Sequence, residues 1–207
     1  MPKIILTFDD APSKNFEKLL NYLIKNEHKA IFFVVGKKVN KNNEKSLIRA
    51  IKKGFLIGNH SYSQPNFSKI SLEESENEIE KTDKIIEKLY KKARIKRPIK
   101  IFRFPFFNQG GVKKAKLQNY LKYRNFENPY YKSYSLLAKF YRGKYDLFCT
   151  LDPKDWSKET TLEKAISKIK NPRNGDIIDL HDHLYSFNRL IRPICGYLKN
   201  KEFILSY

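Results

Sequence analysis

Short apolar runs, rich in β-branched and aromatic residues, alternate along this chain with longer segments whose apolar residues recur at helical spacing. The expected strands are Ile4–Phe8, Ala30–Val35, Phe55–Gly58, Ile101–Phe104, Leu147–Leu151, Ile177–Leu180 and Phe203–Leu205. The expected helices are Phe16–Lys25, Glu44–Lys53, Leu72–Lys92, Val112–Arg124, Leu162–Lys170 and Leu190–Lys199. Such alternation is typical of βα units, so the pattern predicts an α/β fold around a parallel sheet.

Two of the expected helices begin with the sequence of a capping box, in which a hydroxyl and a carboxylate satisfy free backbone N–H groups. These are Ser71–Glu74 and Thr160–Glu163. No internal repeat, low-complexity tract or Gly/Ser linker interrupts the chain. We therefore expect residues 1–207 to form one domain.

The composition is strongly basic, with 42 Lys and Arg against 22 Asp and Glu and a formal net charge of +20 in 207 residues. Such a charge favours anionic partners, namely nucleic acid, anionic lipid or acidic glycan. A hydrophobic content of 41% excludes a disordered basic tail. Two cysteines, Cys149 and Cys195, exclude a disulfide-rich scaffold and lack the spacing of a zinc site. Without a helix-turn-helix, zinc-finger or RNA-recognition signature, specific nucleic-acid binding is not expected.

The apolar run that contains Ile31–Val35 is far shorter than a membrane span. The segment Met1–Asp10 also lacks the long apolar stretch of a signal peptide. A cytoplasmic location is therefore the expectation for this sequence, and export would require a signal outside it. Peripheral contact with an anionic membrane is compatible with the charge.

Residues 113–145 differ from the rest, with nine Lys and Arg, one acid (Glu127) and seven of the 13 tyrosines. We interpret this stretch as an insertion. Its ordinary explanation is a helix and loop with a solvated basic face and inward tyrosine rings, which the usual behaviour of charge runs favours. The alternative is a ligand-facing surface on which tyrosine rings stack on sugars or bases and cations hold anions.

Polar residues follow five of the expected strands. The segments are Asp9–Asp10, Asn59–Gln64, Arg103–Phe106, Asp152–Trp156 and Asp179–His183. In a βα barrel the carboxyl ends of the strands share one face, where the loops assemble the active site. Any one segment has an ordinary structural explanation, such as an Asx turn or a surface ion pair. Five in succession favour a functional site.

The residue types in these segments suit metal-assisted hydrolysis. Adjacent carboxylates point in different directions, so one of Asp9 and Asp10 can bind a metal while the other holds a proton. His60 and a donor four residues later can offer two ligands from one helical turn. Arg103 can keep a neighbouring carboxylate ionised, and His181 near Asp155 suits a general acid.

The ordered set of motifs resembles the polysaccharide deacetylases (carbohydrate esterase family 4). The motifs are Thr7–Asp10, Gly58–Pro65, Arg103–Phe106, Asp155–Trp156 and Leu180–Asp182. This resemblance extends over nearly the whole chain. It implies a distorted, incomplete (β/α) barrel and the metal-dependent removal of N-acetyl groups from sugar polymers.

The same resemblance assigns a role to each matching residue. Asp9 would be the base that activates a water at the metal, and Arg103 would orient Asp9 and keep it charged. His181 would protonate the leaving amine, and Asp155 would tune His181. The expected metal ligands are Asp10, His60 and Gln64, and the expected substrate contacts are Trp156, which would wall the acetyl pocket, Pro105, Phe106 and Leu180.

Three features depart from the family pattern. Gln64 stands where the family has a second metal-binding histidine, and Asp179 stands where it usually has an apolar residue. The interval between Arg103 and Asp155 is also unusually long. Zn²⁺ is the metal expected first. Because an amide oxygen is a weaker zinc ligand than imidazole, Mn²⁺, Co²⁺ or Mg²⁺ are alternatives. Weaker metal binding or no catalytic metal are further alternatives, and His183 is a candidate substitute ligand that nothing in the sequence places at the metal.

The favoured hypothesis is a metal-dependent deacetylase that hydrolyses N-acetyl groups on an amino-sugar glycan or glycan precursor, because Asp9, Arg103, Asp155 and His181 are all retained. An anionic substrate is compatible with the net charge. The alternative is a degenerate deacetylase fold that binds a glycan with little or no catalysis. Gln64, Asp179 and the basic, tyrosine-rich surface of residues 113–145 motivate that alternative. Nucleic-acid binding, which rests on net charge alone, ranks last.

Overall fold

The computed structural model describes residues 3–131, 143–183, 186–199 and 202–203. Its strands are β1 (Lys3–Ala11), β2 (Ile31–Val34), β3 (Leu56–Asn59), β4 (Ile177–His181) and β5 (Glu202–Phe203). All described strand pairs are parallel, in the order β3-β2-β1-β4 with β5 added beside β1. The α-helices are α1 (Phe16–Lys25), α2 (Lys41–Lys52), α3 (Leu72–Ala93), α4 (Lys114–Tyr123), α6 (Leu162–Lys168) and α7 (Arg192–Tyr197).

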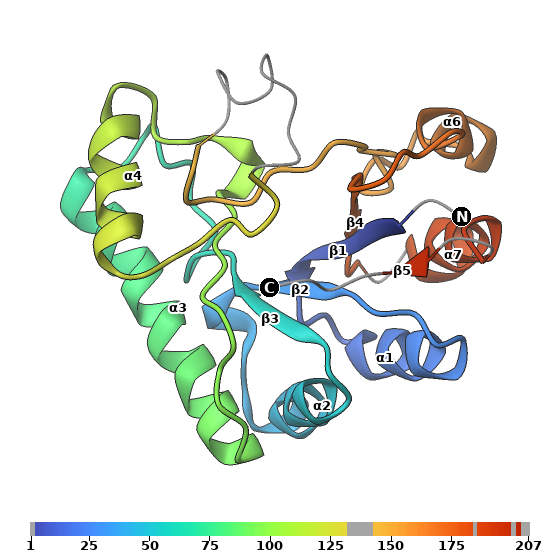
Figure 1. The fold of residues 1–207 in the computed structure, drawn as a ribbon, viewed down its shortest axis with the longest axis horizontal. Coiled ribbons are helices and arrows are strands. Elements are labelled where there is room, and N and C mark those ends of the chain that lie inside the picture. Colours follow the sequence, from blue (N-terminus) through green and yellow to red (C-terminus); the bar gives the residue numbers. More distant parts are fainter. Residues whose placement is uncertain (1–2, 132–142, 184–185, 200–201, 204–207) are drawn as a thin grey trace.

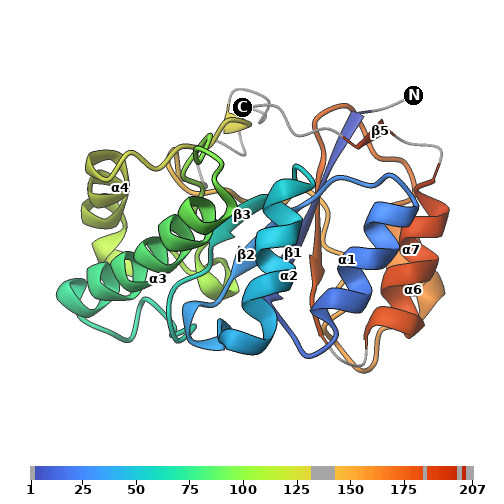
Figure 2. The ribbon, with the colours of Figure 1, turned by 90° about the horizontal axis from the view of Figure 1, so that it is seen from below.

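Helices cover one face of this sheet (Figure 1). Helix α1 contacts α2, α2 contacts α3, and α6 contacts α7. Figure 2 shows α1, α2, α6 and α7 side by side, with α3 and α4 together beyond β3. The largest apolar cluster joins these helices to the sheet and includes buried residues of α1, α2, α3, α6 and α7. The helices therefore bury one side of the sheet and leave its other side for a second core.

The alternation of side chains along β1 divides this strand between the two faces. Ile4, Leu6 and Phe8 belong to the cluster shared with the helices. Ile5 belongs instead to the second cluster, inside the barrel. Thr7 and Asp9 have the parity of Ile5, so they lie on the inner face.

Strand β4 repeats this division, because Ile178 and Leu180 pack with the helices whereas Ile177 lies in the inner cluster. Asp179 and His181 therefore share the inner face with Thr7 and Asp9. The register of the two strands pairs Thr7 with Asp179 and Asp9 with His181. Strand pairing alone thus places four polar side chains together.

The expected strands Ile101–Phe104 and Leu147–Leu151 are wrong as regular strands. Each makes an isolated bridge, Phe102 with Asn59 of β3 and Leu151 with Ile178 of β4. Pro105 and Pro153 follow these bridges, and proline cannot donate to a strand ladder. The regular sheet stops at β3 and β4, which gives the incomplete, distorted (β/α) barrel that the sequence predicts.

Several element ends differ from the sequence prediction. β1 continues to Ala11, so Asp9 and Asp10 lie within its last residues instead of after it. Helix α2 begins three residues early because Asn40 forms a capping box with Asn43.

The two predicted capping boxes have different outcomes. The box from Ser71 to Glu74 is present. At α6 the N-cap is Thr161, which accepts from the Lys164 N–H, so the box expected from Thr160 to Glu163 is wrong by one residue.

The C-terminal part also departs from expectation. The predicted helix Leu190–Lys199 begins as a π-helical turn, Phe187–Ile191, before α7. Strand β5 replaces the predicted Phe203–Leu205, whose last two residues lie outside the described part.

Part of the predicted insertion 113–145, residues 132–142, lies outside the described residues. Its described tyrosines behave differently: Tyr130 is buried in the inner cluster, whereas Tyr123 on α4 is 85% exposed. The predictions of a single domain and of an insertion are not tested by this arrangement. None of the described helices is long and apolar enough to cross a membrane. Both cysteines are free and buried.

Candidate active site

A cavity of about 370 Å³ lies at the carboxyl ends of the strands. Its walls are Asp9, Asp10, His60, Gln64, Phe106, Phe107, Asp152, Trp156, His181 and His183. All of these residues except Phe107 come from the five polar segments predicted after strands, and each segment contributes at least one. The structure therefore gathers the predicted base, the predicted acid and the predicted metal ligands around one space, whereas Arg103 and Asp155 are not in its wall.

Arg103 lies beneath this cavity with no exposed surface. Its Nη1 lies 2.7 Å from Asp9 Oδ1 and 2.6 Å from Asp179 Oδ1, and it donates to Thr7 Oγ1 at 2.8 Å. Burial lowers the pKa of the guanidinium, but the Asp9 and Asp179 carboxylates outweigh burial and raise it above its ordinary value. Arg103 is therefore a fixed cation that orients the Asp9 carboxylate.

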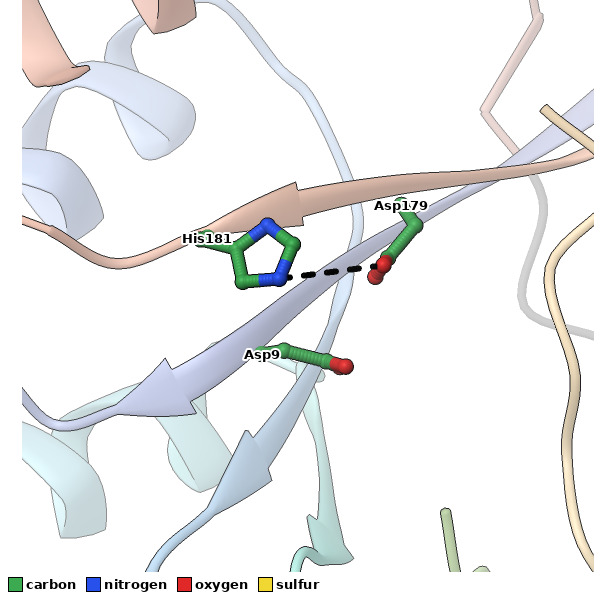
Figure 3. A group of neighbouring side chains, drawn as sticks. All are labelled: Asp9, Asp179 and His181. Atoms are coloured by element: carbon green, nitrogen blue, oxygen red, sulfur yellow. Dashed lines mark ion pairs between the residues drawn. The ribbon is translucent and has the colours of Figure 1, made fainter. Parts of the chain in front are cut away.

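Asp179, the second departure from the family pattern, is fully buried behind Asp9 and does not line the cavity. Figure 3 shows it on β4, with Asp9 on the neighbouring strand β1. Its Oδ2 has no hydrogen-bond partner among the described residues and lies 4.0 Å from His181 Nε2. Burial and the nearby Asp9 raise the pKa of Asp179, while Arg103 and His181 act in the opposite direction. Asp179 therefore contacts Arg103 from behind the site and lies outside the wall of the cavity.

His181 is held by Asp155 through two contacts. The ring Nδ1 lies 2.9 Å from Asp155 Oδ1, and the backbone N–H donates to Asp155 Oδ2 at 3.0 Å. Burial lowers the pKa of the imidazole, but Asp179 and Asp155 outweigh it and raise the pKa of His181 to about 10. The ring is therefore a protonated group at neutral pH, as a general acid requires.

Asp10 is the centre of a second group, which we call the Asp10 group and which consists of Asp10, His60, Gln64 and His183. The Gln64 amide N–H donates to Asp10 Oδ1, and His183 Nε2 lies 2.6 Å from Asp10 Oδ2. Burial raises the pKa of Asp10, but the hydrogen bond from His183 and the positive side chains nearby outweigh it and hold the pKa below its usual range. Asp10 is therefore an ionised carboxylate.

The fourth member, His60, is oriented by a backbone carbonyl. Its Nδ1 lies 2.9 Å from the Arg103 carbonyl oxygen, which accepts from the Nδ1–H tautomer. This tautomer leaves the Nε2 lone pair toward the carboxylates, 3.6 Å from Asp9 Oδ2 and 3.8 Å from Asp10 Oδ1. A metal-binding histidine has this arrangement, in which the outer nitrogen is fixed by a carbonyl or carboxylate.

Charge balance favours the Asp10 group over the neighbouring carboxylates as the place for a divalent metal. Asp9, Asp179 and His181 bring ligand atoms within 4.8 Å of one another (Figure 3). However, the Arg103 guanidinium already bonds both carboxylates of that set, and a second cation there would be repelled. The Asp10 group instead offers an ionised carboxylate and two imidazoles, which are common zinc ligands.

The backbone around the Asp10 group is unusual. Asp10, Ser61 and Gln64 have φ angles of 64°, 65° and 63°, in the left-handed region that non-glycine residues rarely adopt. The Glu78 carboxylate accepts from the backbone N–H groups of Tyr62 and Ser63, which holds this loop in place. The expectation that His60 and Gln64 lie on one helical turn is wrong. The segment between them is a loop, and the left-handed φ angles of Ser61 and Gln64 are incompatible with a right-handed helix. Such strain concentrates at functional sites.

The predicted substrate contacts divide into two pairs. Trp156 and Phe106 line the cavity and are 43% and 69% exposed. Pro105 is buried in the turn beneath Phe106 and is not part of the wall. Leu180 packs with the helices because strand alternation turns it away from Asp179 and His181. The expectation that Leu180 contacts substrate is therefore not supported by its position.

Sequence reasoning did not single out two wall residues, Phe107 and Asp152. Phe107 follows the segment Arg103–Phe106, and Asp152 begins the segment Asp152–Trp156. Their position beside the predicted residues was the signal that could have identified them. The structure also places His183 in the wall and against Asp10, which the sequence could not do.

The chain is similar to several known deacetylases. The family model described as polysaccharide deacetylase matches residues 1–125. A bifunctional xylanase/deacetylase from Pseudobutyrivibrio xylanivorans is 28% identical over 180 residues, which is 86% of this chain and 25% of that protein. A peptidoglycan-N-acetylglucosamine deacetylase from Bacillus cereus is 39% identical over 89 residues, 42% of this chain and 32% of that protein. The chain thus spans about a third or less of the length of these two curated relatives.

Among solved structures, the peptidoglycan deacetylase PdaC from Bacillus subtilis matches with a TM-score of 0.69 and 26% identity, over 99% of this chain and 86% of that one. This agreement extends the likeness beyond the region of the family model to the described C-terminal elements. With more than half of its 207 residues matched by the family model, and with the fold in agreement, the chain belongs to the polysaccharide deacetylase family.

Proposed function

We propose that this chain is a metal-dependent deacetylase that hydrolyses the N-acetyl group of an amino-sugar glycan or glycan precursor. One observation carries the proposal: Asp9 and His181 are register partners on β1 and β4 and line the same cavity. A base and an acid on adjacent strands can act on the two ends of a single amide bond.

Asp9 takes the proton of the attacking water, which adds to the carbonyl carbon of the N-acetyl group. Arg103 is a positioning residue, because its bond to Asp9 Oδ1 leaves Oδ2 directed toward His60 at 3.6 Å and the cavity. His181 donates its proton to the amide nitrogen as the C–N bond breaks. The products are acetate and the free amine of the sugar, so the atoms balance.

Asp155 is a second positioning residue. It accepts from the backbone N–H of His181 with one oxygen and faces Nδ1 with the other. This pairing fixes the ring plane and supports the protonated form that the leaving amine requires. Removing the Asp155 carboxylate would therefore change the proton donor His181 and leave the base Asp9 in place.

Asp10, His60 and a further member of the Asp10 group would hold the divalent metal, with Zn²⁺ first and Mn²⁺, Co²⁺ or Mg²⁺ as alternatives. When bound, such an ion polarises the amide carbonyl and lowers the pKa of water. The donor set supports this, since His60 directs a lone pair toward an ionised Asp10.

The substrate class follows from the relatives and from charge. The names of the curated relatives specify a peptidoglycan-N-acetylglucosamine deacetylase and a xylanase/deacetylase. The net charge of +20 favours the anionic members of such glycans. Exposed Phe106 and Trp156 offer aromatic faces for a sugar ring at the mouth of the cavity.

Release of acetate from N-acetylglucosamine oligomers or peptidoglycan fragments, with each metal added in turn, tests the proposal. Asp9→Asn and His181→Ala should each abolish most of the release. Acetate release unchanged in both variants would reject the assigned roles. Glycan binding with no release under any metal would instead favour the glycan-binding alternative that Gln64 motivates.

A further inference from the structure

The position of Gln64 raises the question of which side chain completes the metal site, an inference that rests on the proposed metal-dependent function. Gln64 directs its amide N–H, and not its oxygen, at Asp10 Oδ1. A carboxylate neighbour enforces this orientation, because the reverse would place two oxygens in contact. Gln64 is therefore a hydrogen-bond donor to the Asp10 carboxylate. Its amide oxygen, the atom that can bind a metal, lies on the other side of the amide group.

His183 lies against the opposite oxygen of Asp10. Its Nε2 is 2.6 Å from Asp10 Oδ2, and both residues line the same cavity. Imidazole nitrogen is a better ligand than an amide for zinc and its neighbours in the first transition row. The two imidazoles, His60 and His183, thus approach the two oxygens of one carboxylate.

The segment that carries His183 is fixed to the barrel. The backbone N–H of Asp182 donates to the Asp9 carbonyl at 2.9 Å. The Asp182 carboxylate accepts from the N–H and hydroxyl of Ser13 at 2.6 and 2.7 Å. The His183 N–H donates to the His181 carbonyl at 2.8 Å. These bonds place the chain at His183 beside the end of β1, where Asp10 stands.

We propose that His183 is the third protein ligand of the divalent metal, with Asp10 and His60. Gln64 then orients the Asp10 carboxylate through its hydrogen bond and does not itself bind the metal. The imidazole that the family supplies after β3 comes in this chain from the end of β4. This assignment explains how the chain tolerates Gln64 while it keeps Asp9, Arg103, Asp155 and His181.

Zn²⁺ binding to the metal-free protein, measured by calorimetry without substrate, tests the assignment. His183→Gln preserves a hydrogen-bonding side chain but removes the imidazole, and should weaken Zn²⁺ affinity by about 100-fold or more, since even outer partners of ligands are worth 10–100-fold. Gln64→Ala should weaken it by less than about tenfold, at the low end of that range. The double variant Gln64→His with His183→Gln should recover most of the affinity, because it returns the imidazole to the family position.

A second readout uses the unaltered protein. Addition of Zn²⁺ should shift the ring resonances of His60 and His183 in NMR spectra and leave those of the buried His28 in place. Wild-type-like affinity in His183→Gln, or a His183 ring unmoved by Zn²⁺, overturns the assignment even if acetate is released. Zn²⁺ bound through His183 without acetate release rejects the proposed function and leaves the ligand assignment standing.

Discussion

The two halves of the cavity differ in how their charges are balanced. On the Arg103 side, a buried guanidinium bonds Asp9 and Asp179, and Asp155 holds His181. On the Asp10 side, the carboxylate has imidazole and amide neighbours, and the His183 side chain is 26% exposed. In the first half Arg103 and His181 are the cations paired with the carboxylates, whereas the second half offers donors to an added cation. Under the proposed function, proton transfer and metal binding would therefore belong to different sides of one space.

Loss of the proposed base, Asp9, should have the largest effect on acetate release. Asp9→Asn removes the proton acceptor while it keeps a side chain of the same size beside Arg103. We expect kcat for acetate release to fall by about 10²- to 10⁴-fold, the usual contribution of a general base. Asp176→Asn is the matched control, because Asp176 stands just before β4, at the opposite end of the sheet. Equal kcat values for the two variants would contradict the role of Asp9.

The Arg103 side should also be the more important half for stability. Arg103→Met leaves the Asp9 and Asp179 carboxylates buried without their cation, which should lower the free energy of unfolding by about 3–5 kcal/mol. Arg124→Met, which breaks the partly exposed pair with Glu80, should cost less than about 1 kcal/mol. Urea denaturation measures both. Similar losses would mean that the buried network is not specially stabilising.

A change at Asp155 should shift the pKa of the proposed acid, His181, without removing the proposed base, Asp9. Burial lowers the pKa of His181, and Asp179 and Asp155 together raise it to about 10. Asp155→Asn removes one raising group, so the pKa of His181 falls and its protonated form is lost at a lower pH. The alkaline limb of the pH profile of acetate release, and the ring shifts of His181 in NMR, should both move to lower pH. An alkaline limb that stays at the same pH would show that His181 is not the proton donor.

The smallest expected effect concerns the mouth of the cavity, which belongs to neither charged half. Trp156→Ala removes an aromatic face worth about 0.5–1.5 kcal/mol, so KM should rise about 2- to 12-fold with kcat nearly unchanged. Tyr123→Ala, at an 85% exposed position on α4 outside this cavity, should leave both constants as they are. A larger change in kcat than in KM would place Trp156 nearer the reacting atoms.

The sequence could predict the strands β1 to β4 and the gathering of Asp9, Arg103, Asp155 and His181, because apolar alternation and strand-end position are local signals. It could not predict that the segments around Phe102 and Leu151 form single bridges, since strand pairing depends on partners distant in the chain. Strand parity could have excluded Leu180 from the cavity, because Asp179 and His181 occupy the opposite face.

The environment of the Asp10 group was also beyond the sequence. Gln64 has a left-handed backbone and donates its amide N–H to Asp10, and nothing in a spacing of four residues indicates either feature. The contact between His183 and Asp10 joins residues 173 positions apart, through a turn fixed by Asp182 and Ser13. Tertiary contacts of this kind decide ligand sets, and motifs alone do not.

Titration of metal-free protein with Zn²⁺, followed by acetate release from an N-acetylglucosamine oligomer, tests the division of labour most directly. We predict almost no release without metal and a rise that saturates near one Zn²⁺ per chain, with Asp9→Asn inactive although it still binds the ion. Release that is independent of metal, or restored Asp9→Asn activity at saturating Zn²⁺, would contradict the account.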